Sequence, residues 1–129
     1  SAAKYPWGNA EPVCGEHAVF YKDAGTCGQG YTTFAVGAGS QKGASPYGAY
    51  DMAGNIWEWT MDWYDKGFYG KAAATAKDAW NSTSAYFRVG RGGDFYYGAV
   101  AFLRAGYRSY GVPSFAYESS GVRCSRSFP

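Results

Sequence analysis

The chain has 129 residues, a length typical of one domain with its own core. Charged residues make up 17% of it and the formal net charge is +2, which excludes the strong electrostatic field expected of a nucleic-acid-binding protein. A hydrophobic fraction of 47% excludes a disordered chain, and the 19 glycines and 13 tyrosines exclude a helix bundle, because both residue types are poor in helix interiors.

Residues 1–48 contain many glycines and prolines and little periodicity, which predicts a long ordered loop with one short strand near Thr33–Val36. Cys14 and Cys27 flank a short segment of this loop. A disulfide between them would stabilise the fold by about 2–3 kcal/mol, the alternative being two free buried thiols. We predict the disulfide, and with it an extracellular or cell-envelope location. The third cysteine, Cys124, is expected to be a buried thiol in a core strand.

Further along the chain, four segments have patterns typical of strands and one has the pattern of a short helix. The clearest strand is Asn55–Met61, where alternation places the indoles of Trp57 and Trp59 on one face. The helix is expected at Lys71–Ala79, and the other strands are expected at Tyr86–Gly92, Phe102–Ser109 and Gly121–Arg126. Short strands joined by long loops predict a single α+β domain over residues 1–129, built on a small twisted antiparallel sheet.

The turn that leads into the first of these strands has residues that suit a hard cation. Asp51, a chain reversal at Gly54 and Glu58 offer carboxylate and carbonyl oxygens close together in the sequence. Ca²⁺ takes roughly six to eight oxygen ligands of these kinds. The alternative is an ordinary turn with two solvated carboxylates, and the spacing alone leaves both interpretations open.

Six sequence blocks are distinctive by their content and their order. They are Tyr5–Asn9, Ala44–Thr60, Asp62–Tyr64, Arg88–Gly93, Leu103–Arg108 and Gly121–Arg126. Together they resemble the ordered blocks of formylglycine-generating-enzyme (sulfatase-modifying-factor) domains. The resemblance covers residues 5–126 and corresponds to the C-terminal half of the family domain. It implies a C-type lectin-like fold with short strands and long ordered loops.

The resemblance also implies a bound metal ion. The block that contains the turn described above is similar to a calcium site of the family. The implied ligands of Ca²⁺ are the side chains of Asp51 and Glu58 and the main-chain carbonyls of Gly54 and Ile56. We therefore expect calcium as the one cofactor.

The catalytic residues of the family are missing from the chain. Catalytic members resembling it carry two cysteines shortly after the Gly-Gly pair, and these bind copper and activate oxygen. The matching stretch, residues 94–102, contains no cysteine. Because Tyr, Ala and Val cannot provide thiolate ligands for copper, we expect a protein that is not an enzyme.

Residues 94–122 are the part of the chain whose composition differs most from that of a structural scaffold. Eight aromatic residues fall between positions 95 and 117, interleaved with serine and glycine. This composition is typical of binding loops, because tyrosine offers a large amphipathic contact area while serine and glycine adapt. The alternative is a small core that is filled by rings. The residues expected to form a ligand-binding surface are Tyr96, Tyr97, Tyr110, Phe115 and Tyr117.

The same segment uses a restricted set of residue types. It contains no Lys, Met, Trp, Gln, Asn, Thr or His. One residue, Glu118, does not fit the choice of residue types found in the proteins described next. Proteins diversified by retroelements often use this fold and vary in this C-terminal region, with a similar choice of residues. The resemblance therefore extends to a retroelement-diversified variable protein.

These features predict a calcium-braced recognition domain that binds a protein or other ligand through its aromatic C-terminal loops. One alternative is an accessory or structural subunit of a larger extracellular or envelope assembly, with the same rings buried against a partner subunit. Another is a divergent oxidoreductase of the formylglycine-generating type. We expect a protein ligand or partner subunit, no nucleic acid and no direct membrane insertion, since no stretch approaches the roughly 20 apolar residues of a membrane span.

Overall fold

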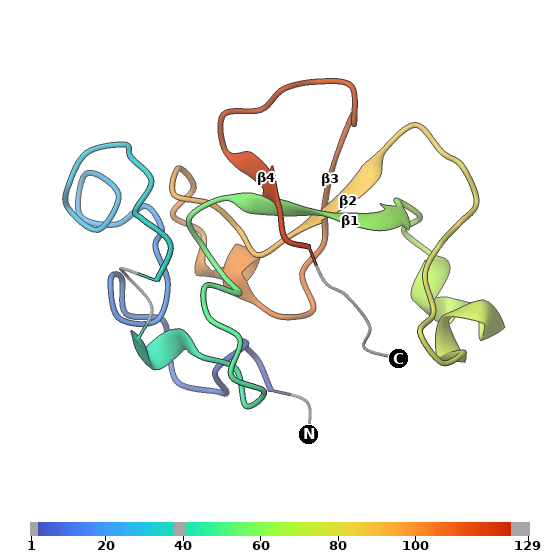
Figure 1. The fold of residues 1–129 in the computed structure, drawn as a ribbon, viewed down its shortest axis with the longest axis horizontal. Coiled ribbons are helices and arrows are strands. Elements are labelled where there is room, and N and C mark those ends of the chain that lie inside the picture. The colour runs from blue at the N-terminus through green and yellow to red at the C-terminus, as the bar shows by residue number, and fades with distance from the viewer. Residues whose placement is uncertain (1–2, 38–40, 125–129) are drawn as a thin grey trace.

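The computed structural model describes residues 3–37 and 41–124, and a four-stranded sheet lies at its centre (Figure 1). The strands are β1 (Trp57–Trp63), β2 (Arg88–Arg91), β3 (Ser109–Gly111) and β4 (Ser120–Val122). The helices of the described residues are short 3-10 turns, η1 (Gln41–Gly43), η2 (Phe68–Gly70), η3 (Ala72–Thr75) and η4 (Val100–Leu103). None of the described helices is long and apolar enough to cross a membrane.

The order of strands across the sheet is β3-β2-β1-β4. The pairs β1–β2 and β2–β3 are antiparallel, as expected from the sequence, but β4 pairs with β1 in parallel. The sheet is therefore mixed rather than purely antiparallel. The parallel pair arises because the loop after β3 carries the chain to the opposite edge of the sheet, and Figure 1 shows this loop projecting away from the strands.

The strand expected near Thr33–Val36 is absent, and the prediction was wrong there. This segment is held by one side chain instead of by a neighbouring strand. Asn55 accepts a hydrogen bond from the main-chain N–H of Phe34 at 2.9 Å and donates one to the carbonyl of Phe34 at 3.0 Å. The amide of Asn55 thus replaces the pairing that a strand would have supplied.

The strand expected at Phe102–Ser109 is also wrong, because β3 begins only at Ser109. The preceding residues form η4 and a turn, in which Leu103 is buried in the core. Arg91 binds this turn through hydrogen bonds from Nη1 to the carbonyls of Ala105 and Tyr107. The guanidinium of Arg91 therefore binds main-chain carbonyls that a neighbouring strand would otherwise have bound.

The helix expected at Lys71–Ala79 is reduced to η3, which ends at Thr75. Ala76 is already extended, with φ of −67° and ψ of 154°, and Asp78 has a positive φ of 54°. The four-residue turn carries no buried residue. Without an apolar face to pack, this alanine-rich segment has no tertiary contact that would extend it.

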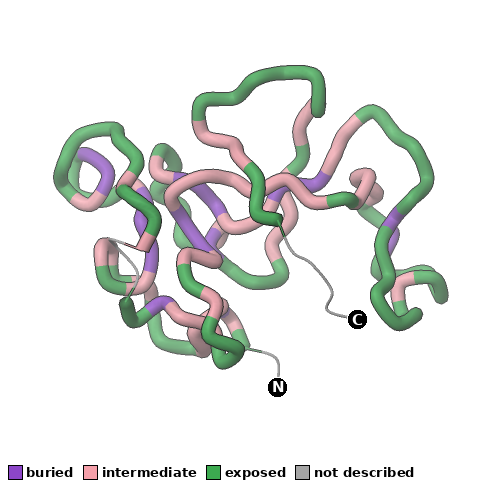
Figure 2. The backbone as a smooth tube through the Cα atoms, in the orientation of Figure 1, coloured by how far each residue is buried: buried purple, intermediate pink, exposed green. Residues whose placement is uncertain are grey.

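The core is small and joins the N-terminal loops to the sheet. Its buried cluster consists of Tyr5, Ala18, Phe20, Ala53 and Leu103. Figure 2 shows the buried backbone as short separate stretches in the loops and strands, with exposed loop tips around them. Aromatic and small residues from loops, rather than helix faces, therefore fill the interior.

Candidate functional site

An aromatic pocket of about 180 Å³ opens on one face of the sheet. The aromatic residues that line it are Trp57, Trp59, Tyr97, Tyr110 and Tyr117. Small residues from the strands and the loop before β4 complete it, namely Gly90, Gly111, Ser109, Ser119 and Ser120. Every strand of the sheet contributes a residue, and no charged side chain belongs to the lining.

The register of the sheet explains why a pocket forms at this place. Trp59 pairs with Gly90, and Gly90 pairs with Ser109, so the three residues lie in one row across the sheet. Residues directly opposite in neighbouring strands point to the same face. A glycine and a serine beside the large indole of Trp59 leave the space that a third bulky side chain would fill.

Gly111 allows two rings to approach the end of β3. A Cβ atom at this position would lie 2.8 Å from Cη2 of Trp59 and 3.3 Å from Cε2 of Tyr117. The two rings lie with their centroids 6.1 Å apart, and the Tyr117 hydroxyl accepts a hydrogen bond from the main-chain N–H of Val112. The absence of a side chain at Gly111 therefore sets the width of the pocket.

The structure brings three of the five aromatic residues expected from the sequence to this pocket. Tyr97, Tyr110 and Tyr117 line it, although the ring of Tyr110 packs against Tyr64 at 4.4 Å and Phe87 at 5.0 Å, outside the lining. Phe115 lies outside but next to it, 6.3 Å from the Tyr117 ring and 60% exposed. Tyr96 points elsewhere, and its ring contacts Tyr31 at 4.9 Å. All five are exposed by at least 40%.

Sequence reasoning missed the two tryptophans and Tyr31 as parts of this surface. The alternation in β1 predicts that Trp57 and Trp59 share a face, but it does not say whether that face is covered. Only the pairing with Gly90 shows that both indoles border open space. Tyr31 lies in a loop without periodicity, and no local signal connects it to Tyr96.

A buried carboxylate shapes the loop that carries Tyr96 and Tyr97. Asp94 is 1% exposed, and its Oδ1 accepts hydrogen bonds from the main-chain N–H groups of Tyr96 at 3.1 Å and Tyr97 at 2.9 Å. Its Oδ2 has no hydrogen-bond partner among the described residues. The main-chain N–H of Phe95 donates to the carbonyl of Asn55 at 3.0 Å. These bonds fix the turn from which both tyrosines project.

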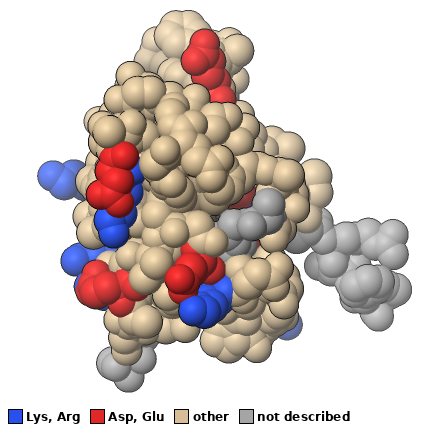
Figure 3. Space-filling view, turned by 90° about the vertical axis from the view of Figure 1, so that its left-hand side faces the viewer, with Lys and Arg blue, Asp and Glu red and all other residues tan. Residues whose placement is uncertain are grey.

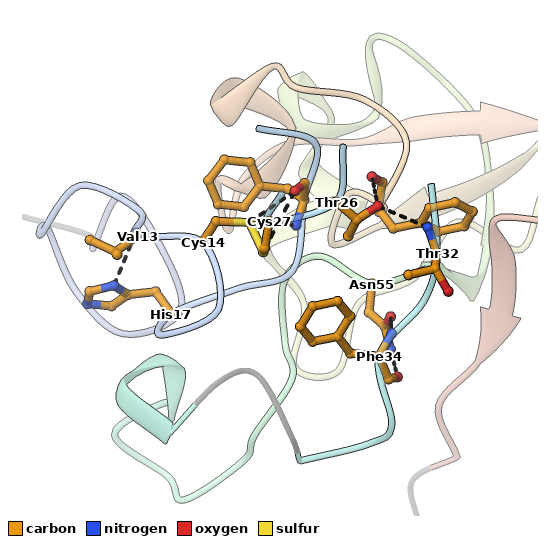
Figure 4. The surroundings of a disulfide bond; sticks show 10 residues. Val13, Cys14, His17, Thr26, Cys27, Thr32, Phe34 and Asn55 are labelled. Atoms are coloured by element: carbon orange, nitrogen blue, oxygen red, sulfur yellow. Dashed lines mark hydrogen bonds between the residues drawn. A yellow bond between two sulfur atoms is a disulfide. The ribbon is translucent and has the colours of Figure 1, made fainter. Parts of the chain in front are cut away.

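The disulfide expected between Cys14 and Cys27 is present, with a Cα–Cα distance of 5.3 Å. Figure 4 shows Thr26 beside the disulfide, with its hydroxyl directed at a neighbouring segment of the same chain. That hydroxyl donates a hydrogen bond to the carbonyl of Phe95 at 3.1 Å. Disulfides are typical of oxidising compartments, so the bond indicates a setting outside the reducing cytosol. The third cysteine differs from expectation: Cys124 is exposed, because β4 ends at Val122 before reaching it.

The turn expected to bind calcium contains several residues with positive φ angles. Asp51 and Asn55 both adopt positive φ angles, 54° and 67°, which non-glycine residues rarely do. Gly54 has φ of 81°, and a Cβ there would lie 2.3 Å from the carbonyl oxygen of Val19. The main-chain N–H of Ile56 donates to the carbonyl of Gly54 at 2.9 Å. Asp and Asn adopt this left-handed conformation more readily than other non-glycine residues, so the sequence of the turn suits its shape.

A guanidinium already binds the oxygens of this turn. Arg123 donates from Nε and Nη2 to the carboxylate of Glu58 at 2.7–2.9 Å, and from Nη2 to the carbonyl of Asp51 at 2.7 Å. Hydrogen bonding to Glu58 raises the pKa of Arg123 above its ordinary value. The Oδ2 atom of Asp51 accepts from the main-chain N–H of Gly37 at 2.6 Å.

The donor set of the turn fits a hard cation by its chemistry. Carboxylates and main-chain carbonyls are the oxygens that Ca²⁺ prefers. A carboxylate offers about four lone-pair positions, so Glu58 can serve a cation and Arg123 together. Among the described residues there is no cluster of three or more His, Cys, Asp or Glu side chains around a common point. Main-chain carbonyls would therefore supply much of the coordination.

A second, larger groove of about 1000 Å³ runs beside this turn. Glu58 and Arg123 line it together with apolar residues, including Met52 and Leu103, and the exposed Cys124 lies at its edge. The groove separates the turn from the N-terminal residues around Tyr5. Its lining combines charged and apolar side chains, unlike the uncharged aromatic pocket.

Comparison with known proteins places the chain in a family. The model of the sulfatase-modifying factor enzyme 1-like domain matches residues 1–128. The chain belongs to this family. The formylglycine-generating enzyme of Thermomonospora curvata is 31% identical over 131 residues, which cover 95% of this chain and 42% of the relative. The serine/threonine-protein kinase pkn1 of Chlamydia pneumoniae is 35% identical over 83 residues, 64% of this chain and 13% of the kinase.

Solved structures agree with the fold. PvdO from Pseudomonas aeruginosa matches 88% of this chain and 40% of its own, with a TM-score of 0.65 and 29% identity. Treponema denticola variable protein 1 matches 83% of this chain and 34% of its own, with a TM-score of 0.62 and 24% identity. The α+β, C-type lectin-like fold expected from the sequence is therefore confirmed. The chain spans less than half the length of these relatives.

Proposed function

We propose that this domain is a non-catalytic recognition module that binds a protein ligand through the aromatic pocket. The observation that carries the proposal is the clustering of Tyr97 and Tyr117 with Trp57 and Trp59 around one uncharged opening. Large rings around a pocket that excludes water are typical of the residues that dominate binding energy in protein interfaces. The volume suits one apolar side chain of a partner, since a cavity of about 150 Å³ accepts a benzene ring.

The composition of the pocket supports binding over catalysis. Its lining contains no carboxylate, imidazole, thiol or amine that could act as an acid, a base or a nucleophile. Residues 94–102 also contain no cysteine, so they lack the thiolates of a copper centre. Tyrosine with serine and glycine is instead the composition of binding loops.

The proposal includes a calcium ion at the turn described above. Asp51 and Glu58 would bind it through their carboxylates, and Gly54 and Ile56 through their carbonyls. The ion would supply positive charge that holds the turn against β1, with Arg123 sharing Glu58. If it binds, 1 mM Ca²⁺ raises the unfolding temperature relative to a chelated sample, because a ligand of the folded state stabilises it by mass action. If the unfolding temperature is the same with Ca²⁺ and with chelator, in the wild type as in Glu58→Gln, the turn does not bind the ion.

A retroelement origin of residues 94–122 is a finer form of the same proposal. The residue types of this segment support it, and the aromatic pocket takes Tyr97, Tyr110 and Tyr117 from it. The test is genomic. A reverse transcriptase gene and an adenine-rich template repeat are expected beside the gene, and their absence from a complete genome would contradict this origin.

A second candidate function is favoured by the larger groove. Its apolar walls include Met61, which is 67% exposed. Exposed apolar surface of this extent often marks contact with another chain, as in an accessory subunit of an extracellular or envelope assembly. In that case the domain alone would associate or aggregate, and sedimentation would show it; a stable monomer would speak against this candidate.

The recognition proposal is tested with a random peptide library displayed on phage. Peptides retained by the folded protein are measured in solution against the wild type, the double variant Tyr97→Ala with Tyr117→Ala, and the control Tyr86→Ala, an exposed tyrosine outside the pocket. We expect at least about a tenfold loss of affinity in the double variant and no change in the control. Equal affinity for all three proteins would contradict the proposal.

A further inference from the structure

The recognition surface continues beyond the pocket as a row of exposed tyrosines. The rings of Tyr97 and Tyr96 lie 5.4 Å apart, and those of Tyr96 and Tyr31 lie 4.9 Å apart. Tyr21 stacks on the far side of Tyr31, at 5.3 Å and 18° between ring planes. The rings of Tyr31, Tyr96 and Tyr97 are each more than half exposed. Because Tyr97 also lines the pocket, row and pocket form one continuous surface.

The disulfide loop holds the outer part of this row in place. Thr26, next to Cys27, is fully buried and bonds the carbonyl of Phe95. Gly98 approaches Tyr21 so closely that a Cβ would lie 3.0 Å from its carbonyl oxygen. Two segments distant in the sequence are thus packed together, and Tyr31 is fixed beside Tyr96.

The chemistry of the surface restricts what can bind it. The side-chain polar groups of the pocket are hydroxyls and the indole N–H groups of Trp57 and Trp59. No described residue accepts a hydrogen bond from either indole N–H, whereas the indole of Trp7 donates to the carbonyl of Ala10. No acidic or basic side chain lines the pocket. A complementary ligand is therefore uncharged, largely apolar and able to offer acceptors to the two indole N–H groups.

Part of the charge elsewhere on the molecule is paired, and the formal net charge is only +2. On the side that carries the N-terminal loops, Figure 3 shows several acidic side chains next to basic ones and others that stand alone on uncharged surface. Lys4 pairs with Glu11, and Lys42 with Glu16 at 2.6 Å. These pairs leave little net field to attract a charged partner.

We propose that the pocket and the row of Tyr31, Tyr96 and Tyr97 bind an extended, proline-rich segment of a partner protein. The proposal rests on the recognition function above and specifies its ligand. Proline lacks a main-chain N–H, and a polyproline helix leaves its carbonyls free as acceptors. Its rings dock on aromatic grooves with little loss of entropy, because the extended form exists before binding. Indole and hydroxyl donors beside exposed ring faces match both properties.

A neutral oligosaccharide fits this surface less well. Each sugar hydroxyl is a donor as well as an acceptor, and burying a donor without a partner is costly. Carboxylate and amide side chains, which would accept from sugar hydroxyls, do not line the pocket. The Tyr and Ser hydroxyls both donate and accept, but the indole N–H groups of Trp57 and Trp59 can only donate, and a chain of free main-chain carbonyls complements these two donors.

The test titrates a decaproline peptide into ¹⁵N-labelled protein and follows the indole N–H signals of Trp57 and Trp59. A glycine-serine peptide of the same length and the glucan cellohexaose serve as matched ligands. Tyr31→Ala and Tyr96→Ala report on the row, and Tyr86→Ala is the control. Tyr97→Phe keeps the ring and removes the hydroxyl. Urea unfolding of each variant confirms that it is folded.

We expect decaproline to shift both indole signals, with an affinity about three- to tenfold weaker in Tyr31→Ala and in Tyr96→Ala and unchanged in Tyr86→Ala. The proposal is overturned if decaproline leaves the indole signals in place, if cellohexaose shifts them and decaproline does not, or if Tyr31→Ala and Tyr96→Ala bind as well as the wild type. In that case, library peptides without proline whose binding still depends on Tyr97 and Tyr117 would continue to support the recognition function. Loss of all peptide binding would remove both.

Discussion

The hydroxyl of Thr26 donates a hydrogen bond to the main-chain carbonyl of Phe95 at 3.1 Å, although 69 residues separate the two in the sequence. The same oxygen accepts from the main-chain N–H of Thr32 at 3.2 Å. One buried side chain therefore connects the disulfide loop with the loop that carries Tyr96 and Tyr97.

Thr26→Val keeps the shape of the side chain and removes both hydrogen bonds. It removes the partner of the Phe95 carbonyl and of the Thr32 N–H, so we expect the free energy of unfolding to fall by about 1–3 kcal/mol, from two hydrogen bonds of about 0.5–1.5 kcal/mol each. Urea denaturation measures the change, with Thr83→Val as the matched control at an exposed threonine. Equal losses in the two variants would show that the bridge contributes nothing.

The disulfide should stabilise the same region. Replacing Cys14 and Cys27 by serine together is expected to lower the free energy of unfolding by about 2–3 kcal/mol, because the unfolded chain regains the freedom of an open loop. Dithiothreitol should bring the wild type to the stability of the double variant and leave the variant unchanged. A wild type whose unfolding curve does not respond to reductant would contradict this prediction.

Gly111→Ala should narrow the pocket. The added Cβ would lie 2.8 Å from Cη2 of Trp59, so the indole must move, and overpacking of this kind costs about 1–3 kcal/mol. We expect weaker binding of pocket-directed peptides together with a modest loss of stability. Gly106→Ala is the control, because a Cβ there meets no atom within 4 Å. If both variants bind as the wild type does, Gly111 does not set the width of the pocket.

Arg123 and Glu58 should be energetically coupled. The side chains are 39% and 22% exposed and share hydrogen bonds on two atoms of the guanidinium, so a double-mutant cycle with Arg123→Ala and Glu58→Gln should give a coupling free energy of about 1 kcal/mol. Chemical denaturation of the four proteins measures it. Strict additivity of the two single changes would mean that the pair does not hold β4 to the Asp51 turn.

Asp65 gives a prediction about pH. Hydrogen bonds from Lys71 and from the main-chain N–H of Gly67 hold the pKa of this carboxyl below its ordinary value. A lowered folded-state pKa contributes stability that is present above the unfolded value and is lost as the pH falls through the folded one. Asp65→Asn should therefore be less stable than the wild type at pH 6, and the difference should shrink at pH 3. A difference that is equal at both pH values would rule out the ionised carboxylate as its source.

The sequence was most informative where the signal is local. The alternation around Trp57 and Trp59 predicted β1 and the common face of the two indoles, and the spacing of Cys14 and Cys27 predicted their bond. Both features depend on residues close together in the chain. The high aromatic content of the C-terminal loops was also evident from the composition.

Features that depend on distant pairing could not be predicted. The pocket requires Gly90 to lie opposite Trp59, which follows only from the register of two strands. Arg123 reaches Glu58 across 65 residues. The alternating residues from Phe102 onward predicted a strand, but burial of Leu103 and the bonds from Arg91 stabilise a turn instead. In these places tertiary contacts outweigh the local pattern.

The most direct test of the account is to map a bound peptide on the protein. The library peptide with the highest affinity is titrated into ¹⁵N-labelled protein, and all main-chain and indole N–H signals are followed. We expect the largest shifts at the indoles of Trp57 and Trp59 and in residues 94–98. Shifts confined to the groove around Met52 and Met61, with both indole signals unchanged, would contradict it.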